Sequence, residues 1–448
     1  MSNLKTITQT SKPLMGKKVL VVGLGLNGGE VGTVKWLVER GAIITVTDLK
    51  TEKELEFSIR ELKKYKIKYV LGKHDIRDFL NSELIIKNPG VPDNLKEINE
   101  ARRKGIPVRL RDNIFMEMNP LPVIGITGTK GKTTTTLLIA KMLEAGGWKV
   151  WVIGNIQGVN SLLVLDKILS TKRTNKEIVI AEFSSWQLAG LGEEKISPKY
   201  ALITNIYPDH LNRYDSMADY IADKQNIYKW QGSEGVLIIP ADSAYDDFQK
   251  QAQGKVIRFD WKIVPEAIGK AFLLSGDHNL NNLAAAYYTA RQMGVNDNQI
   301  TKAIKDFKVV EHRMETVKII NGVTYINDTA STLPTATIAA LDALRGKTVI
   351  LICGGNSKNL PIEEMVEKIR KSCKTIILLK GNATSTLLNQ LGDLCYGPFS
   401  DFKKAILEAK KMANKGDYIL LSPGFTSFGM FKNEFDRGDQ FKKIVNNL

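Results

Sequence analysis

The clearest indication of chemistry lies between residues 122 and 143. The apolar run 122–126 leads into Gly128-Thr129-Lys130-Gly131-Lys132-Thr133, and a helical stretch follows. In such a strand–loop–helix, loop amides and the helix N-terminus bind phosphate, the lysine neutralises the β/γ oxygens and the threonine hydroxyl coordinates Mg²⁺. The spacing departs from the strict phosphate-loop motif, because Ile126 stands where its first glycine is expected. We predict that ATP binds at Gly128, Thr129, Lys130, Gly131, Lys132, Thr133 and Thr134.

A second glycine loop stands near the N-terminus. Gly23-Leu-Gly25-Leu-Asn-Gly28 follows an apolar run, and Asp48 ends the next run, about 20 residues on as in dinucleotide-binding proteins. Such a loop lets a diphosphate approach a helix N-terminus while the carboxylate accepts a hydrogen bond. NAD and a UDP-sugar both offer these groups, and a tight turn without a ligand is the third interpretation. Two phosphate loops on separate segments favour a reaction in which a diphosphate-bearing molecule is presented to ATP.

Three further segments carry polar residues near strand ends. Glu182, in AEFSSWQL, is a predicted oxygen ligand for Mg²⁺, and His210, in NIYPDHLNRY, is a predicted ligand of a second metal or of the substrate. Asn279 and Asn282, in GDHNLNNLAAA, fall on one face of a predicted helix. Their amides suit an adenine edge or a helix cap, and both interpretations stay open.

These residues need a scaffold in which strands alternate with helices. Strand-like runs occur at 16–23, 42–48, 122–126, 177–183, 200–206, 323–328, 347–355, 374–381 and 417–424. The alternation predicts an α/β fold with three parallel or mostly parallel sheets in series. The expected domains are 1–110 with a Rossmann-like sheet, 111–309 as a P-loop-type ATPase, and 310–448 as a second Rossmann-like unit.

Composition limits the class of protein. With 43% hydrophobic and 25% charged residues in 448, the chain is neither disordered nor fibrous. The N-terminus lacks a signal peptide and no run is long enough to span a membrane, so we expect a cytoplasmic protein. Its three cysteines fit no zinc or disulfide pattern and are expected to be buried thiols. The net charge of +15 is spread over helix faces such as 61–68 and 402–415, which favours nucleotides over nucleic acid as ligands.

The ordered motifs resemble those of the muramyl peptide ligases of cell-wall synthesis. The matching segments are GITGTKGKTTTT, AEFSSWQL, NIYPDHLNRY, GDHNLNNLAAA, EHRMETV, YINDTA and LLSPGFTSFGMFKNEFDRGDQF. The resemblance implies three domains, which bind a UDP-sugar, ATP and an amino acid in that order. It also implies that ATP converts a substrate carboxylate to an acyl phosphate, which the incoming amine attacks. Within the family, the D-glutamate-adding members match best, with UDP-N-acetylmuramoyl-L-alanine as the other substrate.

The resemblance also assigns roles to residues. The uridine, diphosphate and muramoyl contacts would be Leu26, Asn27, Asp48, Asn88, Gly90 and Asn155. Lys132 and Thr133 would hold the γ-phosphate and magnesium, and Glu182 and His210 the two metal sites. Asn282, Arg313 and Asp328 would bind adenosine, and the planar fork of Arg313 also suits a transition state rich in phosphoryl charge.

Lys224 matches a family lysine that is carbamylated and acts as a carboxylate near the second metal. From the sequence alone it is a surface lysine on the predicted helix DYIADKQNIY. The resemblance reverses that interpretation and makes Lys224 a catalytic residue together with Lys132, His210 and Arg313.

The acceptor site departs from the family pattern. Asn327-Asp328-Thr329 continues with Ala330-Ser331-Thr332 rather than with a lysine, and Glu434 takes the position of an aromatic residue that appears one place later as Phe435. A carboxylate in a glutamate pocket would repel the substrate unless it points away or pairs with Lys432 or Arg437. The residues expected to bind the acceptor are Thr332, Lys358 and Ser427.

Other functions stay open at this point. A sister muramyl ligase with another acceptor and a folylpolyglutamate-type ligase share the mechanism, although the first glycine loop with Asp48 disfavours the folate type. A nicotinamide-dependent oxidoreductase would leave Lys132, Glu182 and His210 without a role. A nucleic-acid-binding NTPase would need salt-dependent binding to DNA or RNA. We expect a monomer whose domains close over the acyl phosphate to exclude water.

Overall fold

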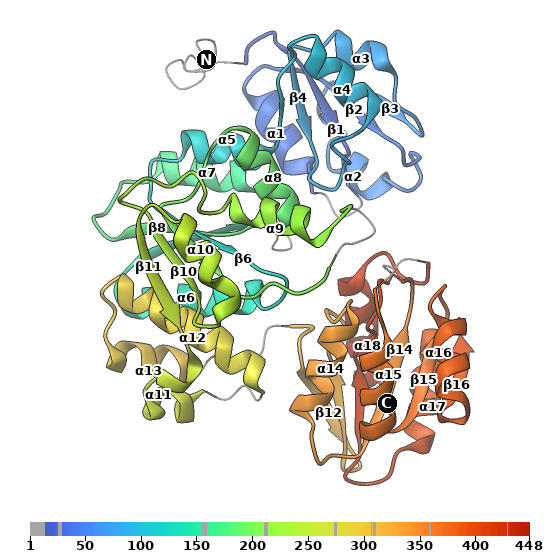
Figure 1. Cartoon of the computed structure of the whole chain (residues 1–448). Helices are drawn as coiled ribbons and strands as arrows, with labels where there is room; N and C mark the ends of the chain where they lie inside the picture. The colour runs from blue at the N-terminus through green and yellow to red at the C-terminus, as the bar shows by residue number, and fades with distance from the viewer. Residues whose placement is uncertain are drawn as a thin grey trace.

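Three α/β units follow one another along the chain (Figure 1). The computed structural model describes residues 14–25, 29–154, 159–209, 214–272, 276–305, 307, 311–357, 360–427 and 429–448. Each unit holds one sheet, of five, six and six strands respectively among these residues. The predicted series of parallel or mostly parallel sheets is confirmed, while the exact boundaries near 110 and 310 stay predictions.

The first sheet has the order β3-β2-β1-β4-β5 and is parallel throughout its described pairs. Its strands are β1 (Lys18–Val22), β2 (Ile43–Asp48), β3 (Ile67–Leu71), β4 (Leu84–Lys87) and β5 (Val108–Arg109). Its helices are α1 (Val31–Glu39), α2 (Glu56–Arg60), α3 (Ile76–Leu80) and α4 (Lys96–Arg103). The strand order reverses between β1 and β4, and ligands of open α/β sheets bind at such a switch point. The first glycine loop follows β1 and Asn88 follows β4, so both reach this point.

The second sheet has the order β11-β10-β9-β6-β8-β7, again parallel. Its strands are β6 (Val123–Thr127), β7 (Lys149–Gly154), β8 (Glu177–Glu182), β9 (Tyr200–Ile203), β10 (Val236–Pro240) and β11 (Lys255–Phe259). Its α-helices are α5 (Arg111–Met118), α6 (Lys132–Ala145), α7 (Ser161–Ser170), α8 (Ser185–Glu193), α9 (Met217–Gln225), α10 (Asp246–Gln251), α11 (Glu266–Ala271), α12 (Asp277–Gln292) and α13 (Asp297–Lys305), with short 3₁₀ turns at Ser243–Tyr245 and Trp261–Ile263. Because β6 lies between β8 and β9, the segments that follow these three strands converge at one edge.

Helix α6 lies on this sheet through an apolar face. Leu138, Ile139 and Leu143 are fully buried, as expected, and Leu137 is half-buried. They share a core with apolar residues of α12, among them Leu283. The helix that starts at the phosphate loop is therefore fixed between the sheet and α12.

The third sheet has the order β12-β13-β17-β14-β15-β16, with only β12 antiparallel among its described pairs. Its strands are β12 (Glu315–Ile320), β13 (Val323–Asn327), β14 (Val349–Gly354), β15 (Cys373–Leu379), β16 (Cys395–Phe399) and β17 (Tyr418–Leu421). Its helices are α14 (Pro334–Ala343), α15 (Glu363–Ser372), α16 (Thr384–Leu391), α17 (Phe402–Met412) and α18 (Glu434–Asn446), with a 3₁₀ turn at Gly392–Leu394. The β12–β13 hairpin turns at Asn321-Gly322, whose φ angles of 51° and 80° suit an Asn-Gly turn.

The thiols differ from the expectation in part. Cys353 is buried in the third core, but Cys373 and Cys395 are only half-buried, since each is the first residue of its strand, β15 and β16 respectively. All three are free. No helix within the described ranges is long and apolar enough to cross a membrane.

Candidate active site

The phosphate loop, residues 128–133, has a backbone that only glycine accommodates at two positions. Gly131, the N-cap of α6, has φ of 80°, and an added Cβ would lie 2.0 Å from Oδ1 of Asn282. At Gly128, φ is 151° and a Cβ would lie 2.0 Å from Oγ1 of Thr204. The side chains of Asn282 and Thr204 thus pack against the loop at Gly131 and Gly128. A glycine loop held in this way at the N-terminus of α6 has the geometry that binds phosphate.

Residues after β9 hold this loop in place. The side chain of Asn205 accepts a hydrogen bond from the Lys130 amide (2.9 Å) and donates one to the Lys130 carbonyl (3.0 Å). The hydroxyl of Thr204 also donates to that carbonyl (2.7 Å). The Thr129 hydroxyl accepts from the amide of Tyr207 (2.9 Å). The side chain of Thr129 is therefore structural, and its part in ATP binding rests on the backbone.

Lys132 lies folded over the loop. Its Nζ donates to the carbonyls of Gly128 (3.0 Å) and Thr129 (3.1 Å), so its charge lies against the backbone of the loop. Thr134 is buried in the first turn of α6. This arrangement places one cation and a helix N-terminus where a triphosphate would bind.

Glu182 and Thr133 form the site expected for Mg²⁺. Glu182 ends β8 and is 2% exposed, and its Oε2 accepts a 2.8 Å hydrogen bond from the Thr133 hydroxyl. Burial raises the pKa of Glu182, and Lys132 is the strongest of the groups that oppose this shift. A buried carboxylate beside a hydroxyl fits a hard cation. No group of three or more His, Cys, Asp or Glu that could hold a metal occurs within the described ranges, which do not include His210.

Lys224 is not on the surface. It lies on α9, is 1% exposed, and donates from Nζ to the carbonyl of Gly128 (3.0 Å). Its Nζ lies 4.7 Å from the ring centroid of Tyr220. Burial lowers the pKa of the Lys224 ammonium well below its usual value, and the charge of Lys132 adds to this effect. The surface interpretation from sequence is wrong, because this face of α9 packs on the phosphate loop.

Asn282 of α12 faces the phosphate loop. Asn282, 5% exposed, accepts a 3.3 Å hydrogen bond from the Thr135 hydroxyl and touches Gly131. The N-cap of α12 is Gly276, and no side chain caps it. Asn282 therefore supports the phosphate loop directly, while its contact with adenosine stays a prediction.

Arg313 and Asp328 lie at the start of the third unit. The carboxylate of Asp328 accepts hydrogen bonds from the hydroxyls of Ser331 (2.5 Å) and Ser422 (2.7 Å). Burial raises the pKa of Asp328 to about 6. The Arg313 guanidinium lowers the pKa of both Asp328 and Glu182, so it lies near carboxylates of the second and third units. It is placed where the two units face each other.

The predicted acceptor residues lie at the carboxyl end of the third sheet. Thr332 is half-buried after β13, and Ser427 is 4% exposed after β17. The hydroxyl of Ser427 makes no hydrogen bond with described residues. A buried hydroxyl of this kind fits a ligand carboxylate.

Arg437 and Glu434 organise the last motif. The guanidinium of Arg437, fully buried, donates to the Thr329 hydroxyl (2.9 Å) and carbonyl (3.0 Å). Burial lowers the pKa of Arg437 to about 10, and the charge of Glu434 opposes this shift. The backbone carbonyl of Glu434 accepts from the same hydroxyl (2.9 Å). Arg437 therefore links α18 to the segment after β13.

In the first unit, Asp48 binds the glycine loop itself. Its Oδ2 accepts from the amides of Leu24 (2.9 Å) and Gly25 (3.4 Å). Asn88 lies beneath the same loop, 3.1 Å from a Cβ built at Gly23, and accepts from the Gly90 amide (2.8 Å). The structure thus brings Asp48, Asn88 and Gly90 together around one loop, with Asp48 engaged by backbone amides.

Five predicted site residues lie outside the described part of the chain: Leu26, Asn27, Asn155, His210 and Lys358. Sequence reasoning missed Thr204, Asn205 and Tyr220, which hold the phosphate loop or lie under Lys224. Thr204 and Asn205 could have been identified from the sequence, because they are polar residues directly after the parallel strand β9.

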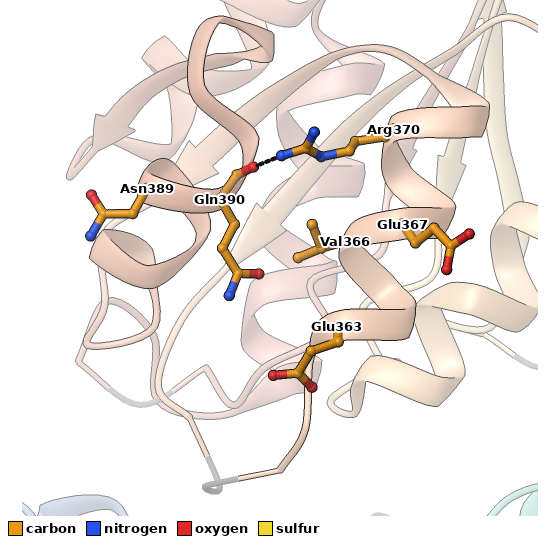
Figure 2. A pocket seen from close by; sticks show the side chains of 6 residues that line it. All are labelled: Glu363, Val366, Glu367, Arg370, Asn389 and Gln390. Atoms are coloured by element: carbon orange, nitrogen blue, oxygen red, sulfur yellow. Dashed lines mark hydrogen bonds between the residues drawn. The ribbon is translucent and has the colours of Figure 1, made fainter.

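A shallow groove elsewhere holds none of these residues. Figure 2 shows it between α15 and α16. It is lined by Glu363, Val366, Glu367, Arg370, Asn389 and Gln390. The guanidinium of Arg370 donates to the carbonyl of Gln390 across the groove (Figure 2). The predicted sites lie at the carboxyl ends of the sheets, away from this groove.

Comparison with known families agrees with this geometry. The chain matches the MurD-like N-terminal domain of Mur ligases at residues 17–109, the Mur ligase middle domain at 126–271 and the Mur ligase glutamate ligase domain at 312–425. This chain belongs to the Mur ligase family, whose members use ATP.

Three similar relatives carry the same name. Proteins called UDP-N-acetylmuramoylalanine-D-glutamate ligase are 38% identical in Roseiflexus sp. (strain RS-1), covering 96% of this chain and 99% of the relative, and 37% identical in Borreliella afzelii (96% and 97%). In Acetivibrio thermocellus the identity is 33%, with 98% of both chains covered.

Solved structures agree on the fold. UDP-N-acetylmuramate-alanine ligase MurC from Thermotoga maritima has a TM-score of 0.61 at 17% identity, covering 96% of this chain and 99% of that one. The MurF ligase of the same organism, in complex with ADP, has a TM-score of 0.57 at 15% identity, covering 98% and 97%.

Proposed function

We propose that this protein is an ATP- and Mg²⁺-dependent ligase that adds D-glutamate to UDP-N-acetylmuramoyl-L-alanine through an acyl phosphate, in peptidoglycan precursor synthesis. One observation carries the proposal: a phosphate loop with Glu182 and the buried Lys224 beside it lies in one unit, and a second glycine loop lies at the switch point of another. The names of the relatives support the choice of substrates.

The phosphate loop drives the first step. Lys132 and the amides at the N-terminus of α6 would hold the β- and γ-phosphates, while Arg313 offsets charge that spreads over the transferred phosphoryl group. The substrate carboxylate attacks the γ-phosphorus, the bond to the ADP oxygen breaks, and an acyl phosphate results. The amine of D-glutamate then attacks the acyl carbon, and phosphate leaves.

Thr133 and Glu182 would hold Mg²⁺, with His210 as the proposed ligand of a second site. When bound, the ion offsets the negative charge of the phosphate oxygens. Lys132 complements this role from the other side of the loop.

Lys224 is proposed to carry a carbamate. Burial lowers the pKa of the Lys224 ammonium, which favours the neutral, nucleophilic amine. The neutral nitrogen attacks CO₂, an N–C bond forms while one C=O electron pair moves to oxygen, and the proton leaves to water. The product is an anion, which converts an ammonium that burial disfavours into a carboxylate-like group beside the phosphate loop.

The two ends of the site bind the other substrates. Leu26, Asn27, Asp48, Asn88, Gly90 and Asn155 are proposed to bind the UDP-sugar, and Thr332, Lys358 and Ser427 the acceptor. Asn282, Arg313 and Asp328 are proposed for adenosine. We also propose the domains 1–110, 111–309 and 310–448, a cytoplasmic location and a monomer.

Replacing Glu182 with Gln is expected to raise the Mg²⁺ concentration for half-maximal activity by about 10- to 100-fold, because one charged oxygen is lost from the ion's site. A Mg²⁺ titration of phosphate release measures this. The control is Glu177→Gln at the other end of β8, where the carboxylate pairs with Lys149 at 2.9 Å. An unchanged titration in Glu182→Gln would remove Glu182 from the metal site.

Replacing Glu434 with Gln is expected to leave the preference for D-glutamate unchanged, because the Glu434 charge acts on Arg437. Phosphate release with D-Glu, L-Glu, D-Asp, D-Lys and L-Lys measures the preference. The exposed Lys432→Gln is the control on the same motif. A gain for D-Glu over D-Lys in Glu434→Gln would show that Glu434 faces the acceptor.

The proposal is tested by its product. Incubation with ATP, Mg²⁺, UDP-N-acetylmuramoyl-L-alanine and labelled D-glutamate should place the label in a nucleotide-sugar product. Label that stays in free glutamate while ATP is consumed would contradict the proposed reaction.

A further inference from the structure

An ion pair within the described residues crosses from the first unit to the second at the first glycine loop. Glu30, directly before α1, is fully buried, and its Oε1 accepts a 2.6 Å hydrogen bond from Nη1 of Arg111 at the start of α5. The Arg111 side chain is 11% exposed, and the same Nη1 donates to the carbonyl of Gly29 (2.6 Å). One guanidinium from the second unit therefore holds Gly29 and Glu30, which connect the glycine loop to α1.

Stability alone is a poor explanation for this pair. Taking two charges out of water costs several kcal/mol per ion, and apolar pairs of similar size are commonly as stable or more so. Neither Oε2 of Glu30 nor Nε of Arg111 makes a hydrogen bond of normal geometry with a residue that the structure describes. Burial raises the pKa of Glu30, and Arg111 opposes that shift. A buried ion pair in which two hydrogen-bonding atoms lack partners within the described ranges indicates a role other than stabilising the fold.

The residues around the Glu30–Arg111 pair show that it positions the N-terminus of α1. The Asn88 amide contacts Oε1 of Glu30 at 3.5 Å, so this carboxylate joins Arg111 to the segment after β4. Asn160, the N-cap of α7, donates to the Gly29 carbonyl (3.4 Å) and to the Thr33 hydroxyl (3.1 Å). Arg111 and Asn160 of the second unit thus both donate hydrogen bonds to the Gly29 carbonyl, at the N-terminus of α1. That is where a diphosphate would be bound by backbone amides.

We infer that Arg111, acting through Glu30 and the Gly29 carbonyl, is a positioning residue for the nucleotide-sugar substrate. A diphosphate at the N-terminus of α1 would be bound by amides whose direction depends on the backbone, and Arg111 holds that backbone at Gly29 and Glu30 from the second unit. The nucleotide-sugar site is therefore incomplete without the second unit. This inference rests on the proposed function, since it concerns the substrate of the same site.

The test compares variants of the full-length enzyme by calorimetric binding of UDP-N-acetylmuramoyl-L-alanine and by KM and kcat. Arg111→Met leaves a buried carboxylate without its counter-charge, so the decisive variant is the double replacement Glu30→Gln with Arg111→Met, which removes both charges. We expect it to fold with a melting temperature near that of the wild type. We also expect its Kd and KM for the nucleotide sugar to rise roughly 10- to 100-fold, with KM for ATP unchanged.

A matched control lies on the same helix and at the same junction. Arg40, at the other end of α1, pairs with Asp166 of α7 far from the glycine loop. Arg40→Met should leave KM for the nucleotide sugar unchanged. Arg111→Lys keeps the charge but not the planar guanidinium, so its KM for the nucleotide sugar should lie between those of the wild type and the double variant.

The outcomes are distinguishable. If the wild type binds the nucleotide sugar and the double variant binds it equally well, the pair is only structural and the inference is overturned. If KM for ATP rises as much as KM for the nucleotide sugar, the effect is general and the inference fails too. If the wild type itself does not bind the nucleotide sugar, the proposed function fails first.

Discussion

Replacing Lys132 with Ala is expected to lower kcat roughly 10³-fold, because a cation that donates to the carbonyls of the phosphate loop is lost where charge develops on the phosphoryl group. The variant should still fold, since Lys132 is half-buried at the start of α6 and is not part of an apolar core. Steady-state phosphate release with saturating substrates measures the loss.

The control for this variant lies on the same helix. Lys141, on the exposed face of α6, forms only a 3.8 Å contact with Glu144, so Lys141→Ala should keep full activity. Lys132→Arg separates charge from shape, since it keeps the cation in a larger planar group. Full activity in Lys132→Ala, with the control intact, would exclude this loop as the site of phosphoryl transfer.

The second large effect is expected at Lys224. Lys224→Ala should lower kcat roughly 10²- to 10³-fold, since a carboxylate-like group beside the phosphate loop is lost. Removing dissolved CO₂ should lower the activity of the wild type, and added bicarbonate should restore it. Neither treatment should change the residual activity of Lys224→Ala. Steady-state kinetics under controlled CO₂, with mass spectrometry of the intact chain under native conditions, measures both.

Two controls separate this chemistry from packing. Lys229→Ala, one turn beyond α9 and exposed, should behave as the wild type. Lys224→Met fills much of the same space without a nitrogen, so it should lose activity but keep the melting temperature within about 5 °C. Wild-type activity that does not respond to CO₂ would leave Lys224 with a packing role only and contradict the carbamate.

The sequence predicts the fold where the signal is local. β-branched apolar runs identified the central strands β1, β6, β8, β14 and β17, and glycines after β1 and β6 identified both loops. Parallel strands put their carboxyl ends at one edge, so the convergence of Lys132 and Glu182 follows from strand order. Some of the strands that were missed, such as β3 and β16, are edge strands whose half-exposed residues lack a continuous apolar pattern. The missed strands β4 and β10 are buried inside their sheets, but their apolar runs are only three and four residues long.

Long-range packing explains the rest. The sequence alone predicts a surface lysine at position 224, because nothing within that helix shows that α9 packs on the phosphate loop. Gly128, which Lys224 contacts, lies 96 residues earlier in the chain. The Glu30–Arg111 pair is likewise invisible in sequence, since its partners stand 81 residues apart and belong to different units. Asp48 was predicted from its spacing, but only the structure shows that loop amides occupy its carboxylate.

The most direct test of the proposed function is phosphate release from ATP and Mg²⁺ with UDP-N-acetylmuramoyl-L-alanine, with and without each of D-Glu, L-Glu, D-Lys, L-Lys and D-Asp. We predict release that requires both the nucleotide sugar and D-Glu, and that falls to background when either is omitted. Release that requires the nucleotide sugar but another amino acid would reassign the acceptor residues around Ala330 and Glu434. Release that is independent of the nucleotide sugar, or absent with every acceptor, would contradict the proposed function.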